Sequence, residues 1–198
     1  MNLNSANGIT GCMRLSFNAS LLSLGLLALS NPARADSARR YDVEPGQAMV
    51  NVTLGSAAQT SAVSLGLAGS LHESNGRFRT ELQVPLNSFG SGSAAIYART
   101  FASLGAAEFP VLTFEGTAPA PGKDGRTRFT GTLRLHGVTQ QIEVSATLSR
   151  IGDRIYAHAS FPLSLGKFGV TVPGFSDLLR IDLDAGLRPM PEPLASRG

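Results

Sequence analysis

Few residues of this chain have the type and spacing that catalysis or metal binding needs. The sequence contains three histidines, His72, His136 and His158, and no two of them have the four-residue spacing that puts two ligands on one face of a helix. It contains no G-x-S-x-G, Walker or dinucleotide-binding glycine pattern. The sequence therefore predicts no metal site, no catalytic residue and no cofactor, and we interpret the histidines as surface or turn residues.

The carboxylates offer no better candidate for acid–base catalysis. Glu73, Glu81 and Glu143 are assigned to the polar sides of alternating segments, where a solvated carboxylate is a poor general acid. In the same register the apolar side carries no charged residue, so it can hold an apolar chain but cannot transfer protons. We therefore expect a binding protein and not an enzyme. The alternative is a small barrel isomerase or hydrolase that acts on a lipid-like substrate.

Alternation of apolar and polar residues dominates the rest of the sequence. The stretch FTGTLRLHGVTQQIEVSATL, residues 129–148, places Phe129 and Leu133 on one side of a strand and Arg134 on the other. The turn signal Asn75-Gly76 and other short connections predict antiparallel neighbours, and spacing within 93–109 predicts one short helix. The predicted strands are 48–54, 63–71, 78–86, 112–116, 129–135, 142–148, 155–161 and 179–185.

Eight antiparallel strands with one apolar face must bury that face in a barrel or a sandwich. Several presumed inner positions are small, among them Gly131, Ala146, Ala157 and Ala159. An unfilled cavity costs about 24 cal/mol per Å³, so small inner residues favour a lumen that a ligand fills. An ordinary packed core explains the same apolar positions equally well, and would fit a secreted interaction module.

The first 35 residues have the pattern of a secretory signal peptide. The short apolar run Ser20–Ser30 is followed by the small-x-small cleavage site Ala33-Arg34-Ala35, and the run is too short to span a membrane. We expect a mature chain that begins at Asp36, lacks the single Cys12 and has no transmembrane segment. Its net charge is about +1 once Arg14 and Arg34 are removed from the 17 basic and 14 acidic residues. These dispersed charges predict no binding to nucleic acid.

Four segments carry a resemblance to the YceI-like family of lipocalin-like, exported polyisoprenoid-binding proteins. They are YDVEP (41–45), FPVLTF (109–114), FTGTLRLHGVT (129–139) and FGV (168–170). The resemblance extends over 41–187. It implies an antiparallel barrel in the periplasm, with an apolar lumen that holds long isoprenoid chains, including quinone-like ones, and it favours the lumen over a packed core.

The chain departs from the family pattern near the expected mouth of the barrel. It has Leu165-Gly166-Lys167 where the family usually has Arg-Ser-Asp, and it keeps only Arg99 of an Arg-Asp-x-x-Leu run. The candidates for contacts with a lipid head group are Tyr97, Arg99, His136, Lys167 and Phe168. The residues expected to line the lumen are Leu67, Leu82, Phe114, Phe129, Leu133, Leu135, Val144, Ala146, Ala157, Phe161 and Ile181.

Taken together, these patterns predict an all-β, eight-stranded antiparallel lipocalin-like barrel over residues 36–188, with a short helix in one connection. A disordered tail is expected over 189–198. We expect the barrel to hold or carry a long apolar isoprenoid-like lipid, such as a polyprenyl or quinone tail, in the periplasm. The sequence leaves open whether the protein forms a homodimer.

Overall fold

The computed structural model describes residues 38–55, 60–92, 98, 100 and 102–191. The single-turn 3₁₀ helices η1 (Leu86–Ser88) and η2 (Gly166–Phe168) lie among its strands. The strands are β1 (Arg39–Leu54), β2 (Thr60–Ser64), β3 (Ala68–Ser74), β4 (Arg77–Pro85), β5 (Phe89–Ser91), β6 (Val111–Pro119), β7 (Arg126–Leu135), β8 (Val138–Ile151), β9 (Arg154–Ser164) and β10 (Leu178–Pro189).

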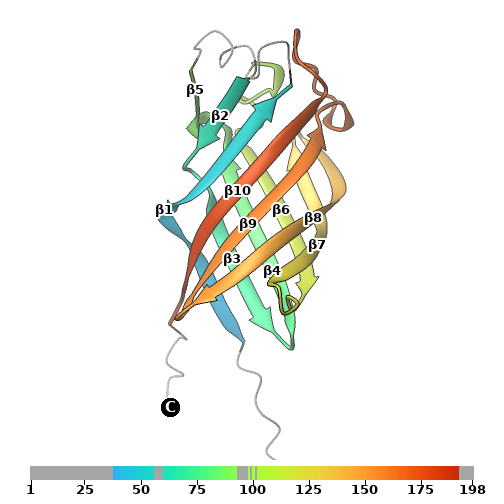
Figure 1. Cartoon of the computed structure of the whole chain (residues 1–198). Helices are drawn as coiled ribbons and strands as arrows, with labels where there is room; N and C mark the ends of the chain where they lie inside the picture. Colours follow the sequence, from blue (N-terminus) through green and yellow to red (C-terminus); the bar gives the residue numbers. More distant parts are fainter. Residues whose placement is uncertain (1–37, 56–59, 93–97, 99, 101, 192–198) are drawn as a thin grey trace, which may run out of the picture. The chain divides into compact units, whose positions relative to one another are not determined.

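Eight of these strands close into an antiparallel barrel (Figure 1). The ring runs β1-β3-β4-β6-β7-β8-β9-β10, and pairing of β10 with β1 closes it. Alternation gives every strand one inward and one outward face, so the apolar positions gather inside the ring. The predicted all-β, eight-stranded antiparallel barrel is confirmed.

The strand predicted over 63–71 is wrong in one respect, because the structure breaks it into β2 and β3. Val63 and Leu65, expected inside, have exposed fractions of 38% and 64%. The Ser64 hydroxyl accepts a hydrogen bond from the Gly66 backbone N–H at 3.0 Å and shares a second bond with the Ser88 hydroxyl at 2.6 Å. Residues 65–67 form this turn and belong to neither strand. The alternation of inward and outward side chains is interrupted there, and Leu67 is buried although Val63 and Leu65 are exposed.

The two parts of the broken strand continue the barrel at different heights. The start of β1 pairs with β3, and its end pairs with β2, where Leu54 lies opposite Thr60. β2 in turn pairs with β5, which continues the direction of β4 after η1. β2 and β5 thereby extend the sheet beyond the closed ring at the upper end in Figure 1.

Tight turns join several of the neighbouring strands. Asn75 and Gly76 have φ angles of 49° and 66°, and His136 and Gly137 have φ angles of 54° and 71°. Left-handed residues at both central positions give a two-residue turn whose twist matches the twist of the flanking strands. The hairpin predicted at Asn75-Gly76 is therefore confirmed, and a turn of the same kind joins β7 to β8.

Two predicted segments lie at the limits of the described residues. Within 93–109, the described residues 98, 100, 102 and 103 are helical, whereas 93–97, 99 and 101 lie outside the described residues. The predicted tail 189–198 begins inside β10, because Pro189 pairs with Tyr41 and the Met190 N–H donates to the Arg40 carbonyl at 2.8 Å. Residues 192–198 lie outside the described residues.

The connection between β9 and β10 packs its apolar side chains inward at the upper end. Phe168 has an exposed fraction of 0%, and Val170 and Val172 are also buried. Asp177 holds the two ends of this loop together, because its carboxylate accepts hydrogen bonds from the Ser164 hydroxyl and the Gly166 backbone N–H. The loop therefore supplies part of the core as well as a connection.

Candidate binding cavity

An apolar cavity lies inside the closed ring. Its volume is about 120 Å³. All eight strands of the ring supply lining residues, and Thr80 is the single polar residue among them. The Thr80 hydroxyl donates to the Ser70 carbonyl at 3.0 Å, so its donor is already used. The cavity can therefore accept apolar groups but offers a ligand almost no polar partner.

The residues predicted to line the lumen lie almost without exception on this cavity. Leu135 differs, because it lines a second apolar cavity nearer the upper end. Whether these side chains contact a ligand stays a prediction. The predicted residues on the cavity wall are Leu67, Leu82, Phe114, Phe129, Leu133, Val144, Ala146, Ala157, Phe161 and Ile181.

The cavity has further lining residues that the sequence analysis did not assign to it, among them Thr80 and Phe89. Thr80 shares the face of Phe78 and Leu82, so strand periodicity alone would have found it. Phe89 lies in β5, a strand of three residues after η1, and such a short strand has no readable alternation. Its ring forms part of the wall of both cavities.

Alanines, and not glycines, leave the cavity open. Ala146 faces Ala159 across β8 and β9, and Ala157 faces Ala185 across β9 and β10. All four line the cavity, so a strip of short side chains crosses three neighbouring strands. Because each stops at its Cβ atom, this side of the barrel contributes little volume to the interior.

The inner glycine Gly131 has a different role from the one expected. A Cβ atom on Gly131 would lie 2.0 Å from the Glu115 carbonyl oxygen and 2.5 Å from the Gly116 Cα atom. Gly131 and Gly116 are direct partners across β6 and β7. Their missing side chains allow close backbone approach, and they do not leave space for a ligand.

The second apolar cavity continues the first toward the upper end. It has a volume of about 70 Å³, and it shares Val52, Phe89, Leu112 and Ile181 with the first. Leu86, Leu135, Leu163 and Leu165 are among its other lining residues. The shared walls make one apolar space that extends from the ring toward the loops above it.

The candidate head-group residues are only partly brought together. The His136 Nδ1 atom lies 3.2 Å from the Phe168 carbonyl oxygen, and the Lys167 carbonyl accepts a hydrogen bond from the Gln140 amide at 2.8 Å. The Phe168 side chain is fully buried and lines neither apolar cavity, and Lys167 is exposed. Tyr97 and Arg99 lie outside the described residues.

The placement of Glu73 on a polar surface is wrong. Its side chain is 29% exposed and forms an ion pair with Arg150 at 2.8 Å. It also accepts a hydrogen bond of 3.2 Å from the hydroxyl of Tyr41, whose exposed fraction is 1%. Glu73 follows the buried Leu71 by two positions, so alternation places both on the inner side of β3.

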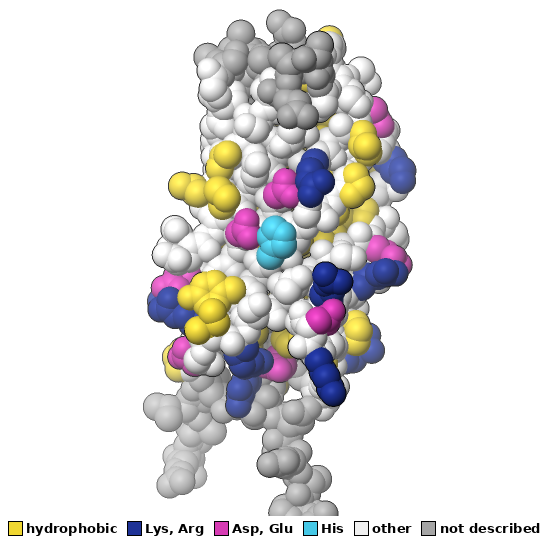
Figure 2. Space-filling model, in the orientation of Figure 1, with side chains coloured by type: hydrophobic (Ala, Val, Ile, Leu, Met, Phe, Trp, Pro, Cys, Tyr) yellow, Lys and Arg dark blue, Asp and Glu magenta, His cyan; other side chains and the backbone are white. Residues whose placement is uncertain are grey.

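The outer surface carries charges of both signs. Figure 2 shows basic and acidic side chains interspersed on the face that it presents. On the outer side of β9 and β10, His158 lies 2.8 Å from Asp184 and Arg180 lies 3.2 Å from Asp182. Exposed pairs of this kind are screened by solvent and contribute little to stability. Among the helices of the described residues, none is long and apolar enough to cross a membrane.

Solved structures with the same fold are distant in sequence. BcnA of Burkholderia cenocepacia superposes with a TM-score of 0.67 at 16% identity, over 73% of this chain and 99% of that protein. A polyisoprenoid binding domain of Saccharophagus degradans, implicated in plant cell wall breakdown, gives 0.63 at 18% identity, over 75% and 97%. A YceI protein of Campylobacter jejuni gives 0.51 at 12% identity, over 91% and 94%.

Comparison with curated protein sequences gives no match. The family model for the YceI-like domain matches residues 41–187, which span all eight strands of the ring except the first two residues of β1 and the last two of β10. The match covers most of the chain, and the solved structures share its fold. The chain therefore belongs to the YceI-like domain family.

Proposed function

We propose that this protein binds and carries a long apolar lipid of the isoprenoid class, such as a polyprenyl or quinone tail, inside its barrel. The observation that carries the proposal is the cavity wall, which is apolar at every lining residue except Thr80. The family membership and the printed description of the Saccharophagus degradans domain as polyisoprenoid binding support the same class of ligand.

The chemistry of the wall favours an apolar chain over other ligands. Transfer of apolar surface from water into such a cavity stabilises the complex by about 25 cal/mol per Å². A polar or charged group would lose its hydration and find no free partner on this wall, which costs several kcal/mol. The cavity therefore selects for hydrocarbon and against polar ligands.

The same wall supports binding rather than catalysis. General acid–base chemistry needs a titratable side chain within hydrogen-bond reach of the substrate. None of the lining residues of the two apolar cavities is titratable. We therefore propose a carrier and not an isomerase or hydrolase.

The proposed location is the periplasm. It rests on the signal-peptide pattern of residues 1–35, which lie outside the described residues. A long prenyl chain is almost insoluble in water, so a closed barrel would shield it between membranes.

Mass spectrometry of an organic extract of the purified mature protein tests this function. We expect a prenyl lipid in amounts comparable to the protein, and none in the extract of an unrelated exported protein purified in parallel. Protein stripped of lipid should also take up a prenyl alcohol, such as solanesol, from detergent micelles. An extract without apolar lipid, together with no uptake of the alcohol, would refute the proposal.

A further inference from the structure

The lower end of the cavity lies just above a group of polar side chains. Val43 of β1, Leu71 of β3 and Leu148 of β8 line the cavity. β1 runs upward in Figure 1, whereas β3 and β8 run downward. Because side chains alternate, the residue two positions farther down each strand points to the same inner side.

Those residues are Tyr41, Glu73 and Arg150, which we call the floor cluster. The Arg150 Nη2 atom lies 2.8 Å from the Glu73 carboxylate, and the Nη1 atom donates to the Tyr41 hydroxyl at 2.6 Å. The Tyr41 hydroxyl donates to Glu73 at 3.2 Å, and the guanidinium carbon lies 5.5 Å from the centre of the Tyr41 ring. Each member therefore contacts both of the others.

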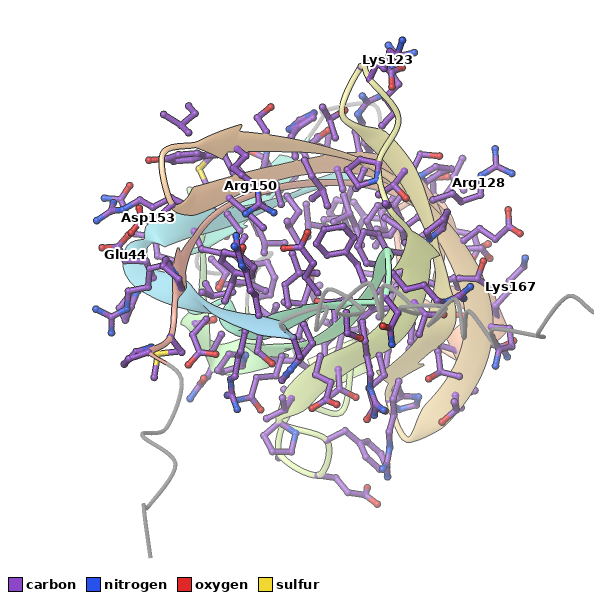
Figure 3. The ribbon with its side chains drawn as sticks, turned by 90° about the horizontal axis from the view of Figure 1, so that it is seen from below. Glu44, Lys123, Arg128, Arg150, Asp153 and Lys167 are labelled. Carbon is purple, nitrogen blue, oxygen red and sulfur yellow. The ribbon has the colours of Figure 1, made fainter. Side chains whose placement is uncertain are left out.

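The contacts of the floor cluster cross the bore of the barrel. In the ring order β1-β3-β4-β6-β7-β8-β9-β10, β8 and β3 are four strands apart in either direction, so they stand opposite each other. Arg150 and Glu73 nevertheless meet at 2.8 Å. Figure 3, seen from below, shows Arg150 over the bore and Glu44 outside the ring.

The bonds within the cluster hold the Arg150 side chain in its charged form. The hydrogen bond that Arg150 donates to Glu73 is the largest cause, and it raises the pKa of Arg150 above its ordinary value. A charged, bonded guanidinium loses its partners if a hydrocarbon chain displaces it, and the chain gains no polar contact in return. Extension of an apolar chain past Leu71 and Leu148 into the floor cluster is therefore unfavourable in free energy.

We propose that the floor cluster closes the lower end of the lipid cavity and sets the longest chain that the barrel accepts. Lipid then reaches the cavity from the upper end, where the second apolar cavity continues the first. This inference rests on the proposed function, because it specifies how much of a prenyl chain the same cavity holds.

A chain-length profile tests the proposal. Lipid-free wild-type protein and Arg150→Ala are titrated with farnesol, geranylgeraniol and solanesol, prenyl alcohols of increasing length, presented in detergent micelles. Arg150→Ala removes the side chain that spans the bore. We expect the variant to bind the longest alcohol at least about tenfold more tightly than the wild type, since two further buried carbons are enough for that factor. Affinity for the shortest should change less than about twofold.

Arg154→Ala is the matched control. The Arg154 Nη1 atom pairs with the Glu44 carboxylate at 3.0 Å, between β9 and β1 at the same end of the barrel. Arg154 precedes the buried Ile155, so it lies on the outer side, and Figure 3 shows Glu44 outside the ring. The control removes an ion pair of similar length from the same end but leaves the bore closed, and its profile should equal that of the wild type.

The outcomes separate this inference from the proposed function. If the wild type binds none of the alcohols, the lipid-carrier function itself fails. If the wild type binds and folded Arg150→Ala shows the same profile, the floor is refuted. The floor is also refuted if the variant loses affinity for all lengths alike, because the cluster would then contact the ligand. If Arg150→Ala does not fold, Glu73→Ala removes the opposite half of the bridge and is judged by the same profile.

Discussion

The imidazole of His136 stands edge-on against the ring of Phe109, with 5.4 Å between the ring centroids and 74° between the ring planes. His136 belongs to the turn between β7 and β8, and Phe109 precedes β6. This contact fixes the turn against the segment that enters β6. The Phe109 ring also lies so close to the next residue of the turn, Gly137, that a side chain there would collide with it.

Gly137→Ala should destabilise the protein through this contact. The φ angle of 71° makes the new residue left-handed, which costs about 1–2 kcal/mol of folding free energy. A Cβ atom would also lie 2.7 Å from Phe109 Cε1, and overpacking of this kind costs a further ~1–3 kcal/mol. Urea unfolding measures the sum.

Gly76→Ala is the matched control for that measurement. Its φ angle is 66°, yet a Cβ atom there would meet nothing within 4 Å. The control should show the backbone cost alone. Equal losses of stability for the two variants would show that the Phe109 contact does not constrain the turn.

Ala146→Trp should fill space that the ligand needs. Ala146 is one of the alanines that keep the cavity open, and it faces Ala159. In a lipid carrier, we expect the folded variant to retain less lipid with a melting temperature close to that of the wild type. Ser145→Trp, on the exposed side of the same strand, should retain lipid normally. A stability loss of about 1–3 kcal/mol in a parent protein that holds no lipid would indicate a packed core instead.

Asp177→Asn should remove part of the acid dependence of stability. The hydrogen bond from the Ser164 hydroxyl, followed by that from the Gly166 N–H, lowers the pKa of Asp177 below its ordinary value of 3.8. A lowered folded-state pKa means that the unfolded chain binds the proton more readily, so the stabilisation is present above pH 3.8 and is lost as the pH falls through the folded-state pKa.

Melting temperatures across the acid range measure this effect. Asp177→Asn should melt below the wild type at neutral pH, and the two curves should converge as the pH drops below 3.8. Asp153→Asn, at an exposed position in the turn between β8 and β9, is the control for removal of one surface carboxylate. A constant difference between Asp177→Asn and the wild type at every pH would contradict the linkage.

The exported protein should begin at Asp36. The cleavage pattern Ala33-Arg34-Ala35 follows the apolar run of the signal peptide. N-terminal sequencing of protein from the periplasmic fraction measures the start directly. A chain that retains Met1 or Met13 would argue against export by this signal.

Much of the barrel could be predicted from alternation, because every second side chain of a strand points inward and is apolar where that face is buried. The rule fails at the turn around Gly66. The Ser64 hydroxyl, which accepts from the Gly66 N–H, is held by the Ser88 hydroxyl, 24 residues away along the chain. Periodicity within one segment carries no information about such a partner. It therefore placed Val63 and Leu65 inside when the structure has them outside.

The candidate site likewise has one part that local sequence patterns predict and one part that they do not. The lumen residues follow from local patterns, so their faces could be assigned before the barrel was known. The bridge from Arg150 to Glu73 exists only because ring closure brings opposite strands within reach at the lower end. A charged residue near a strand end is usually solvated, and only the three-dimensional course of β3 and β8 shows otherwise.

The pairing of β1 with β10 has a consequence for how the protein folds. Tyr41 lies opposite Pro189 and Leu54 opposite Leu179, so the ring is completed by contacts between segments far apart along the chain. Such contacts require a large loss of chain entropy before they form, and proteins rich in them fold slowly. Until β10 arrives, one edge of β1 keeps unpaired backbone groups that could pair with another copy. Pairing of β10, the strand of the ring farthest from β1 along the chain, thus removes this exposed edge.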